Sequence, residues 1–129
     1  MLDTNVCIMY LNGESVALQR RFQFIDLQEI AVCSVVKYEL FFGAMRSHNP
    51  SDAWRRQQRF LSVFVSLPFD DFAALIAGRI RAQLANNGTP IGNNDVLIAS
   101  IAIANNLTLV THNTGEFSRI EGLEIEDWE

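Results

Sequence analysis

The sequence has two cysteines, one lysine and no long apolar run. Cys7 and Cys33 stand in apolar stretches without ligand-like spacing or a neighbouring histidine, so neither a zinc site nor a disulfide framework is indicated, and buried reduced thiols are expected. The longest apolar stretch, 96–104, is too short to cross a bilayer, and no basic run precedes an apolar segment near Met1. A cytoplasmic chain without membrane contact is therefore expected.

Basic residues are also scarce. Ten basic residues stand against fifteen acidic ones, and the net charge of −5 counts against a phosphate-rich partner. The charges are uneven, however, because four arginines fall close together at positions 46, 55, 56 and 59, while five acids lie within the last nine residues. The sequence is therefore still compatible with a local basic patch. The acidic tail is expected to be electrostatically separate from any substrate site.

The overall composition is that of an ordinary globular domain. Hydrophobic residues make up 49% of the 129 positions and charged residues 19%, which excludes disorder on compositional grounds. A chain of this length buries roughly two thirds of the surface that its unfolded form exposes. No repeat, linker or low-complexity segment interrupts it, so one domain over 1–129 is expected.

Apolar periodicity alternates between strand and helix along the chain. Strands are expected ending at Asp3 and over 29–33, 66–69, 107–111 and 123–126. Helices are expected over 5–11, 14–24, 35–45, 53–65 and 95–105, with one more between Asp70 and a stop signal at 87–90. The expected N-caps are Ser34, Asp70, and Asn93 or Asn94. This alternation predicts an α/β fold, a single three-layer α/β/α sandwich around a mainly parallel central sheet.

Three acidic residues stand where the chain leaves a strand or enters a helix. Asp3 ends the first strand, Glu39 lies in the first turns of the helix after the second, and Asp95 begins the apolar helix. Because open α/β sheets bind ligands outside the carboxyl ends of their strands, all three are expected at one edge. Taken singly, each has a plainer reading, as a helix cap or as the partner of an arginine.

Gathered carboxylates need a compensating charge. Neither Glu39 nor Asp95 has a basic residue adjacent in sequence, so a bound cation is the natural compensation if no basic side chain arrives from elsewhere. Oxygen ligands favour Mg²⁺ or Mn²⁺ over zinc. Such an ion lowers the pKa of bound water and neutralises charge on a phosphate, which predicts phosphodiester hydrolysis by one or two ions.

The acids lie within four longer patterns: MLDTN at 1–5, YELFFGA at 38–44, GTPIGNND at 88–95, and LVTHN at 109–113 followed by Glu116 and Phe117. In this order, and over essentially the whole chain, they resemble the PIN-domain family, specifically the VapC-like toxins of bacterial toxin–antitoxin pairs. The resemblance implies that Asp3, Glu39 and Asp95 are catalytic metal ligands and that Asn5 and Thr111 support them. It also implies an endoribonuclease dependent on Mg²⁺ or Mn²⁺, with RNA, often tRNA, as substrate.

The resemblance further implies a homodimer and a VapB-like antitoxin, whose C-terminal segment obstructs the site from a groove, commonly through a basic side chain. Net acidity suits such a partner.

Two departures from the family pattern stand out. Asn113 replaces the fourth aspartate of many relatives, and Glu116 completes the site if Gly115 turns the chain inward, while Asn113 can still hold a water. Only Met1 and Leu2 precede Asp3, so a weak central strand is expected.

Two other functions stay open. A metal-dependent phosphohydrolase of small substrates also uses an aspartate after its first strand, although Asn5 stands where such an enzyme would need a second acid. A degenerate domain that only binds a partner is the non-enzymatic alternative, motivated by Asn113.

A few residues have both a functional and a plain interpretation. His112 can be read as a general base, and Arg79 and Arg81 as phosphate contacts, but solvated surface positions are the more frequent meaning of such residues. Trp54 and Phe60 are expected in the core or in a dimer contact.

Overall fold

The computed structural model describes residues 1–129, in which helices and short strands alternate. The elements are, in chain order, α1 (Thr4–Leu11), α2 (Val16–Phe24), the 3-10 helix η1 (Leu27–Glu29), β1 (Ala31–Cys33), α3 (Ser34–Met45), α4 (Pro50–Leu61), β2 (Val65–Leu67), α5 (Asp71–Asn86), α6 (Asn93–Ala104), β3 (Leu109–Val110), α7 (Thr114–Phe117) and β4 (Ile125–Glu126). No helix combines the length and apolar character that a membrane span requires.

All strand pairings are parallel. β1 pairs with β2, and β3 pairs with β4. The opening residues join the two pairs, because Leu2 N–H donates to Ala31 O at 3.0 Å on one side, while Asp3 N–H donates to Val110 O at 2.9 Å on the other. The opening strand itself is reduced to a single bridge between Leu2 and Val110. The sheet therefore runs in the order β2, β1, opening segment, β3, β4, with Asp3 at the end of its middle member.

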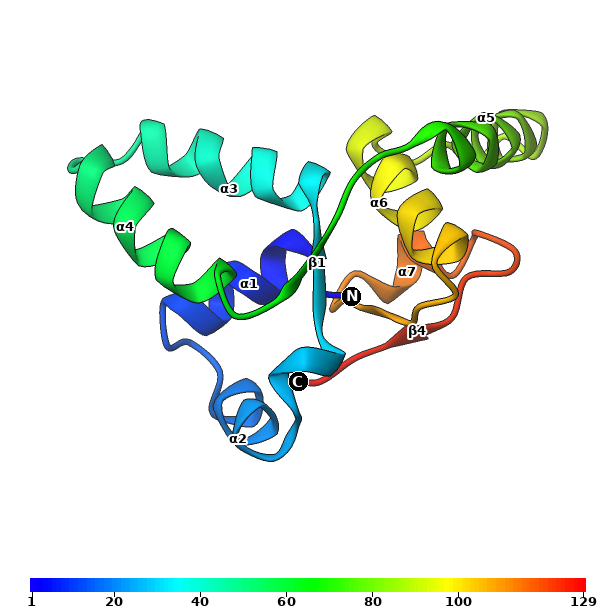
Figure 1. The fold of residues 1–129 in the computed structure, drawn as a ribbon. Helices are drawn as coiled ribbons and strands as arrows, with labels where there is room; N and C mark the ends of the chain where they lie inside the picture. The colour runs from blue at the N-terminus through cyan, green and yellow to red at the C-terminus, as the bar shows by residue number, and fades with distance from the viewer.

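Helices cover both sides of this sheet. Figure 1 shows α1 to α4 gathered on one side of β1, and α5, α6 and α7 on the other. Parallel strands need long crossover connections, and helices that make these crossovers bury both faces of a sheet. The predicted α/β fold with a mainly parallel sheet is confirmed.

The core follows the apolar pattern of the sequence. Leu2, Val32 and Leu109, from three neighbouring strands, are fully buried, and α6, apolar nearly all round, is buried over most of its length. Cys7 and Cys33 are buried free thiols, as expected. Phe60 also lies in the core, whereas Trp54 of the same helix is 45% exposed and does not.

Several predicted helix boundaries were wrong. Cys33, not Ser34, is the N-cap of α3, because the Ser34 hydroxyl donates instead to Leu67 O on the neighbouring strand. Helix α6 begins at Asn93 with Gly92 as N-cap and no side-chain cap. Helix α4 ends at Leu61 rather than at 65, because the N–H of Val65 bonds to Ile30 O and joins the sheet.

Candidate active site

Asp3 lies at the carboxyl end of the central segment and is only 5% exposed. Its Oδ1 accepts a hydrogen bond from Thr4 N–H at 2.8 Å, which caps α1, and its Oδ2 accepts one from the Thr111 hydroxyl at 2.8 Å. Burial raises the pKa of Asp3, the bonds from Thr111 and Thr4 oppose this rise, and repulsion from Glu39 adds to it. Asp3 is thus a helix cap and also a member of a wider network.

Glu39 reaches the same edge from α3. Because α3 starts immediately after β1, its second turn stands above the end of the sheet. Glu39 Oε1 accepts a hydrogen bond from the Thr4 hydroxyl at 2.7 Å. No arginine or lysine forms an ion pair with Glu39, so the plain reading as a salt-bridge partner is wrong.

Asp95 stands in the first turn of α6 and is half-buried. It is not the N-cap, since Gly92 holds that place. Burial, followed by repulsion from Asp3, Glu39 and Glu116, raises the pKa of Asp95 to about 6. Asp95 and the three acids whose charges act on its pKa, Asp3, Glu39 and Glu116, are named the carboxylate cluster. With Glu39, Gly92, Asn93 and Asn94, Asp95 lines an open pocket of about 360 Å³ that contains no hydrophobic side chain.

The remaining residues of the site follow β3 in the chain. The buried Thr111 hydroxyl donates to Asp3 and accepts the Asn113 N–H at 3.0 Å. Asn113 Nδ2 donates in turn to Glu116 Oε2 at 3.1 Å. Glu116 lies in the short helix α7, which also contains Gly115, and its charge adds to the rise in the pKa of Asp95.

The residue beside Asp3 that contacts the site is Thr4. Asn5, expected to support the acids, is exposed and makes no side-chain hydrogen bond to them. Sequence reasoning overlooked Thr4, although a hydroxyl directly after Asp3, at the first position of a helix, was a signal for it. One position along a helix turns a side chain by about 100°, which moves Asn5 off the face that Thr4 occupies.

The donor set fits a hard divalent cation. The four carboxylates supply only oxygen ligands, and none of them is ion-paired with a basic side chain. No three of them bring ligand atoms within 4.8 Å of one another. A bound cation would offset the repulsion among these four acids.

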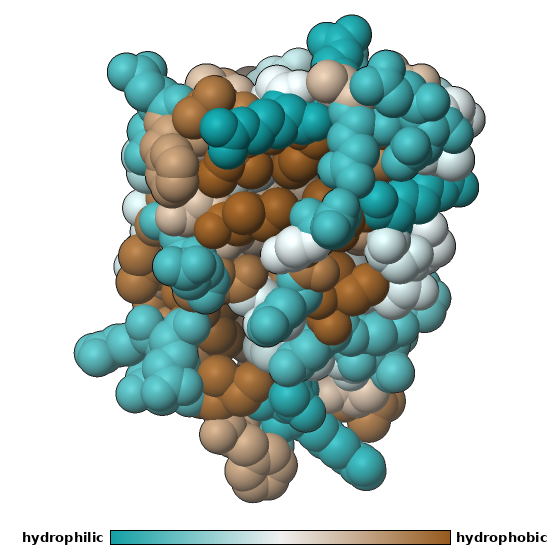
Figure 2. Space-filling view, turned by 90° about the vertical axis from the view of Figure 1, so that its right-hand side faces the viewer, coloured by the Kyte–Doolittle hydropathy of each residue, from teal (hydrophilic) through white to brown (hydrophobic).

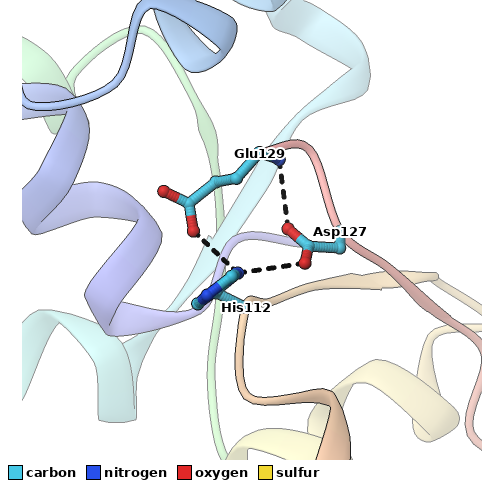
Figure 3. Close-up of side chains that lie close together, drawn as sticks. All are labelled: His112, Asp127 and Glu129. Atoms are coloured by element: carbon cyan, nitrogen blue, oxygen red, sulfur yellow. Dashed lines mark hydrogen bonds and ion pairs between the residues drawn. The ribbon is translucent and has the colours of Figure 1, made fainter.

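The most compact group of possible ligands lies elsewhere. His112 Nδ1 stands 3.0 Å from Asp127 Oδ2 and 2.9 Å from Glu129 Oε2, and Figure 3 shows the imidazole turned toward both carboxylates. All three residues are exposed. This group ties the acidic tail to the end of β3, so the imidazole faces the tail rather than the carboxylate cluster. The acids that raise the pKa of Asp95 are Asp3, Glu39 and Glu116, none of which belongs to the tail.

The surface arginines differ in their position relative to the site. Arg79 and Arg81 are exposed on α5, as a solvated helix face predicts. Arg56 of α4 donates to Leu11 O at 2.9 Å and lines a pocket of about 310 Å³ whose other residues include Glu39. Among the clustered arginines, Arg56 is therefore the one that borders the same space as a site acid.

The parallel sheet with acidic residues at one edge places the chain among the α/β proteins. Sequence comparison identifies the family. The PIN domain family matches residues 1–123, and the chain belongs to this family.

Relatives cover nearly the whole chain. The chain is 38% identical over 128 residues to the "tRNA(fMet)-specific endonuclease VapC" of Salmonella typhimurium, an alignment that covers 99% of this chain and 96% of that protein. It is 37% identical to "Ribonuclease VapC2" of Rickettsia felis, with 100% and 97% covered.

Solved structures agree with this assignment. The DNA-bound VapBC of Salmonella typhimurium superimposes with a TM-score of 0.94 at 38% identity, covering 100% of this chain and 97% of that chain. VapBC2 of Rickettsia felis, bound to a DNA fragment from its promoter, gives 0.92 at 36% identity, with 100% and 98% covered.

Proposed function

We propose that this chain is the toxin ribonuclease of a toxin–antitoxin pair, a divalent-metal-dependent endoribonuclease that hydrolyses phosphodiester bonds of tRNA in the cytoplasm. One observation carries the proposal. Asp3, Glu39, Asp95 and Glu116 have no basic partner, and burial together with repulsion from the other three acids raises the pKa of Asp95 to about 6. A bound divalent cation would offset the repulsion within such a cluster, which supports a metal-dependent activity.

Asp3, Glu39, Asp95 and Glu116 are the proposed ligands of Mg²⁺ or Mn²⁺. When bound, such an ion lowers the pKa of a coordinated water and neutralises charge at the reacting phosphate. The chain itself fixes the ligands. Thr111 holds Asp3 Oδ2, and Asn113 holds Glu116 Oε2. The open polar pocket beside Glu39 and Asp95 leaves room for a phosphodiester.

The Salmonella relative, named for its action on tRNA(fMet), supports tRNA as the substrate class. The net charge of −5 comes partly from the acidic tail, where Glu126 pairs with Arg21, and Asp127 and Glu129 lie beside His112. Arg56 supplies a positive charge on the pocket that includes Glu39, where it can meet a phosphate next to the cleaved one.

The proposed partners are a VapB-like antitoxin and a second copy of the chain. Solved relatives named VapBC support the antitoxin. Exposed apolar side chains support the homodimer, since Phe72 and Leu75 of α5 are 57% and 51% exposed. Figure 2 shows apolar surface in its upper half, over the end of the molecule where Figure 1 places α5.

Cleavage of a purified tRNA pool tests the proposal. Wild type with Mg²⁺ is expected to give discrete tRNA fragments, whereas EDTA, Asp3→Asn and Asp95→Asn each abolish them. Strong turnover of p-nitrophenyl phosphate with intact RNA would instead indicate the small-substrate phosphohydrolase. If neither tRNA nor p-nitrophenyl phosphate is hydrolysed but the antitoxin binds tightly, the result would indicate the degenerate scaffold.

A further inference from the structure

Thr4 hydrogen-bonds two acids of the cluster at once. Its backbone N–H donates to Asp3 Oδ1 at 2.8 Å, and its hydroxyl donates to Glu39 Oε1 at 2.7 Å. Asp3 and Glu39 are 36 positions apart in the sequence. The hydrogen bond from the Thr4 hydroxyl to Glu39 links the two acids through Thr4.

This contact completes a continuous chain of hydrogen bonds. From Glu39 it passes through Thr4 to Asp3, and from the second oxygen of Asp3 through Thr111 and Asn113 to Glu116. Three carboxylates are thereby fixed relative to one another. Asp95 stands outside this chain, because no hydrogen bond holds its carboxylate.

The chemistry of the Thr4–Glu39 bond suits a charged acceptor. A hydroxyl that donates to an ionised carboxylate makes a short bond, about 2.5–2.7 Å, that is stronger than one between neutral groups. Glu39 and Asp3 repel each other when ionised, so without this donor Glu39 would relax away from the edge. The remaining oxygen, Glu39 Oε2, stays free for a ligand.

We propose that Thr4 is a positioning residue, which links Asp3 to Glu39 and so sets the affinity of the site for a divalent cation. The inference rests on the proposed function, because it takes the carboxylates as metal ligands. Thr4 touches neither ion nor RNA in this scheme and acts through Asp3 and Glu39. Asp95, whose carboxylate makes no hydrogen bond, would be the remaining ligand of such an ion.

Two substitutions isolate the hydroxyl. Thr4→Val keeps the shape and the backbone N–H to Asp3 but removes the donor to Glu39, whereas Thr4→Ser keeps the donor. Thr108→Val is the matched control, since Thr108 also donates to a glutamate, Glu124, at 3.4 Å, at the opposite end of β3.

Mn²⁺ binding without RNA, followed by the EPR signal of free Mn²⁺, is the first readout. Loss of a residue that orients a metal ligand costs about 10–100-fold in affinity. Thr4→Val is therefore expected to weaken Mn²⁺ binding by about 10-fold or more, with Thr4→Ser and Thr108→Val within about 3-fold of wild type. Cleavage by Thr4→Val should recover at high Mg²⁺, while the KM for tRNA stays unchanged. Thermal midpoints in EDTA show whether each variant is folded.

The outcomes separate the two claims. Wild-type Mn²⁺ affinity in folded Thr4→Val, or equal losses in Thr4→Val and Thr4→Ser, overturns the role of the hydroxyl and leaves the ribonuclease proposal intact. Weakened binding in Thr4→Val together with no RNA cleavage by wild type supports Thr4 and overturns the ribonuclease. Absence of Mn²⁺ binding by wild type overturns both.

Discussion

The Thr111 hydroxyl donates a hydrogen bond to Asp3 Oδ2 at 2.8 Å, across 108 positions of sequence. Both side chains are buried, so neither can replace the other with water. The bond stabilises the charged form of a carboxylate whose pKa burial raises. It also connects the two halves of the carboxylate cluster, because Thr111 binds Asn113 and Asp3 binds Thr4.

Thr111→Val is expected to be destabilising and nearly inactive. The substitution keeps the volume of the side chain but leaves Asp3 Oδ2 buried without a donor, which costs about 1–3 kcal/mol in free energy of unfolding. Urea unfolding measures this loss. Thr111→Ser retains the donor and should lie closer to wild type in both stability and cleavage; equal losses in the two variants would contradict the assigned role of the hydroxyl.

Asp95→Asn is expected to abolish cleavage and to stabilise the metal-free protein. Removing one of four repelling charges relieves repulsion, by up to about 1 kcal/mol for a half-exposed group. Loss of a metal ligand lowers the cleavage rate by about 100-fold or more. Thermal midpoints in EDTA and a tRNA cleavage assay measure the two effects. A clearly lower midpoint would contradict the repulsion argument.

The same residue predicts a pH dependence of stability. The pKa of folded Asp95, about 6, lies above its ordinary value of 3.8, so the folded chain binds this proton more tightly than the unfolded chain. The contribution of Asp95 to the free energy of unfolding therefore falls as pH rises from about 4 to about 6, and the loss is complete above that range. In EDTA, the midpoint of Asp95→Asn should exceed that of wild type increasingly across this window. A constant difference would show that Asp95 titrates normally.

Glu116→Gln is expected to lower cleavage by about 10-fold or more, because Glu116 is the proposed ligand in place of the fourth aspartate. Glu29→Gln is the control, since Glu29 is exposed and lies before β1, at the other end of the sheet. Mg²⁺ titrations of cleavage should show a weaker apparent affinity in the first variant alone. Equal activity of both variants would remove Glu116 from the site.

Arg56→Gln is expected to raise the KM for tRNA with little change in kcat. Arg56 borders the pocket beside Glu39, and each lost phosphate contact lowers the salt slope of binding by about one. Arg79→Gln on α5 removes the same charge from a solvated face and should bind as wild type. Matching salt slopes for wild type and Arg56→Gln would argue against an RNA contact at this position.

Much of the fold could be predicted from the sequence, because periodicity and stop signals are local. Helix α5 follows its predicted cap at Asp70, and the apolar α6 is buried as its composition requires. The errors fell at boundaries where a long-range bond competes with a local one. Val65 leaves α4 for the sheet, and the Ser34 hydroxyl bonds to Leu67 rather than to its own helix.

The sequence by itself determined which carboxylates stand at strand ends and helix starts, since these places depend on residues a few positions away. Only the tertiary structure decided how they are held. Thr4, rather than Asn5, binds Glu39, and Asn113 orients Glu116. These choices depend on the packing of α1 against α3 and on the turn into α7, so their cause is the relative placement of elements far apart in the chain, which local preferences do not encode.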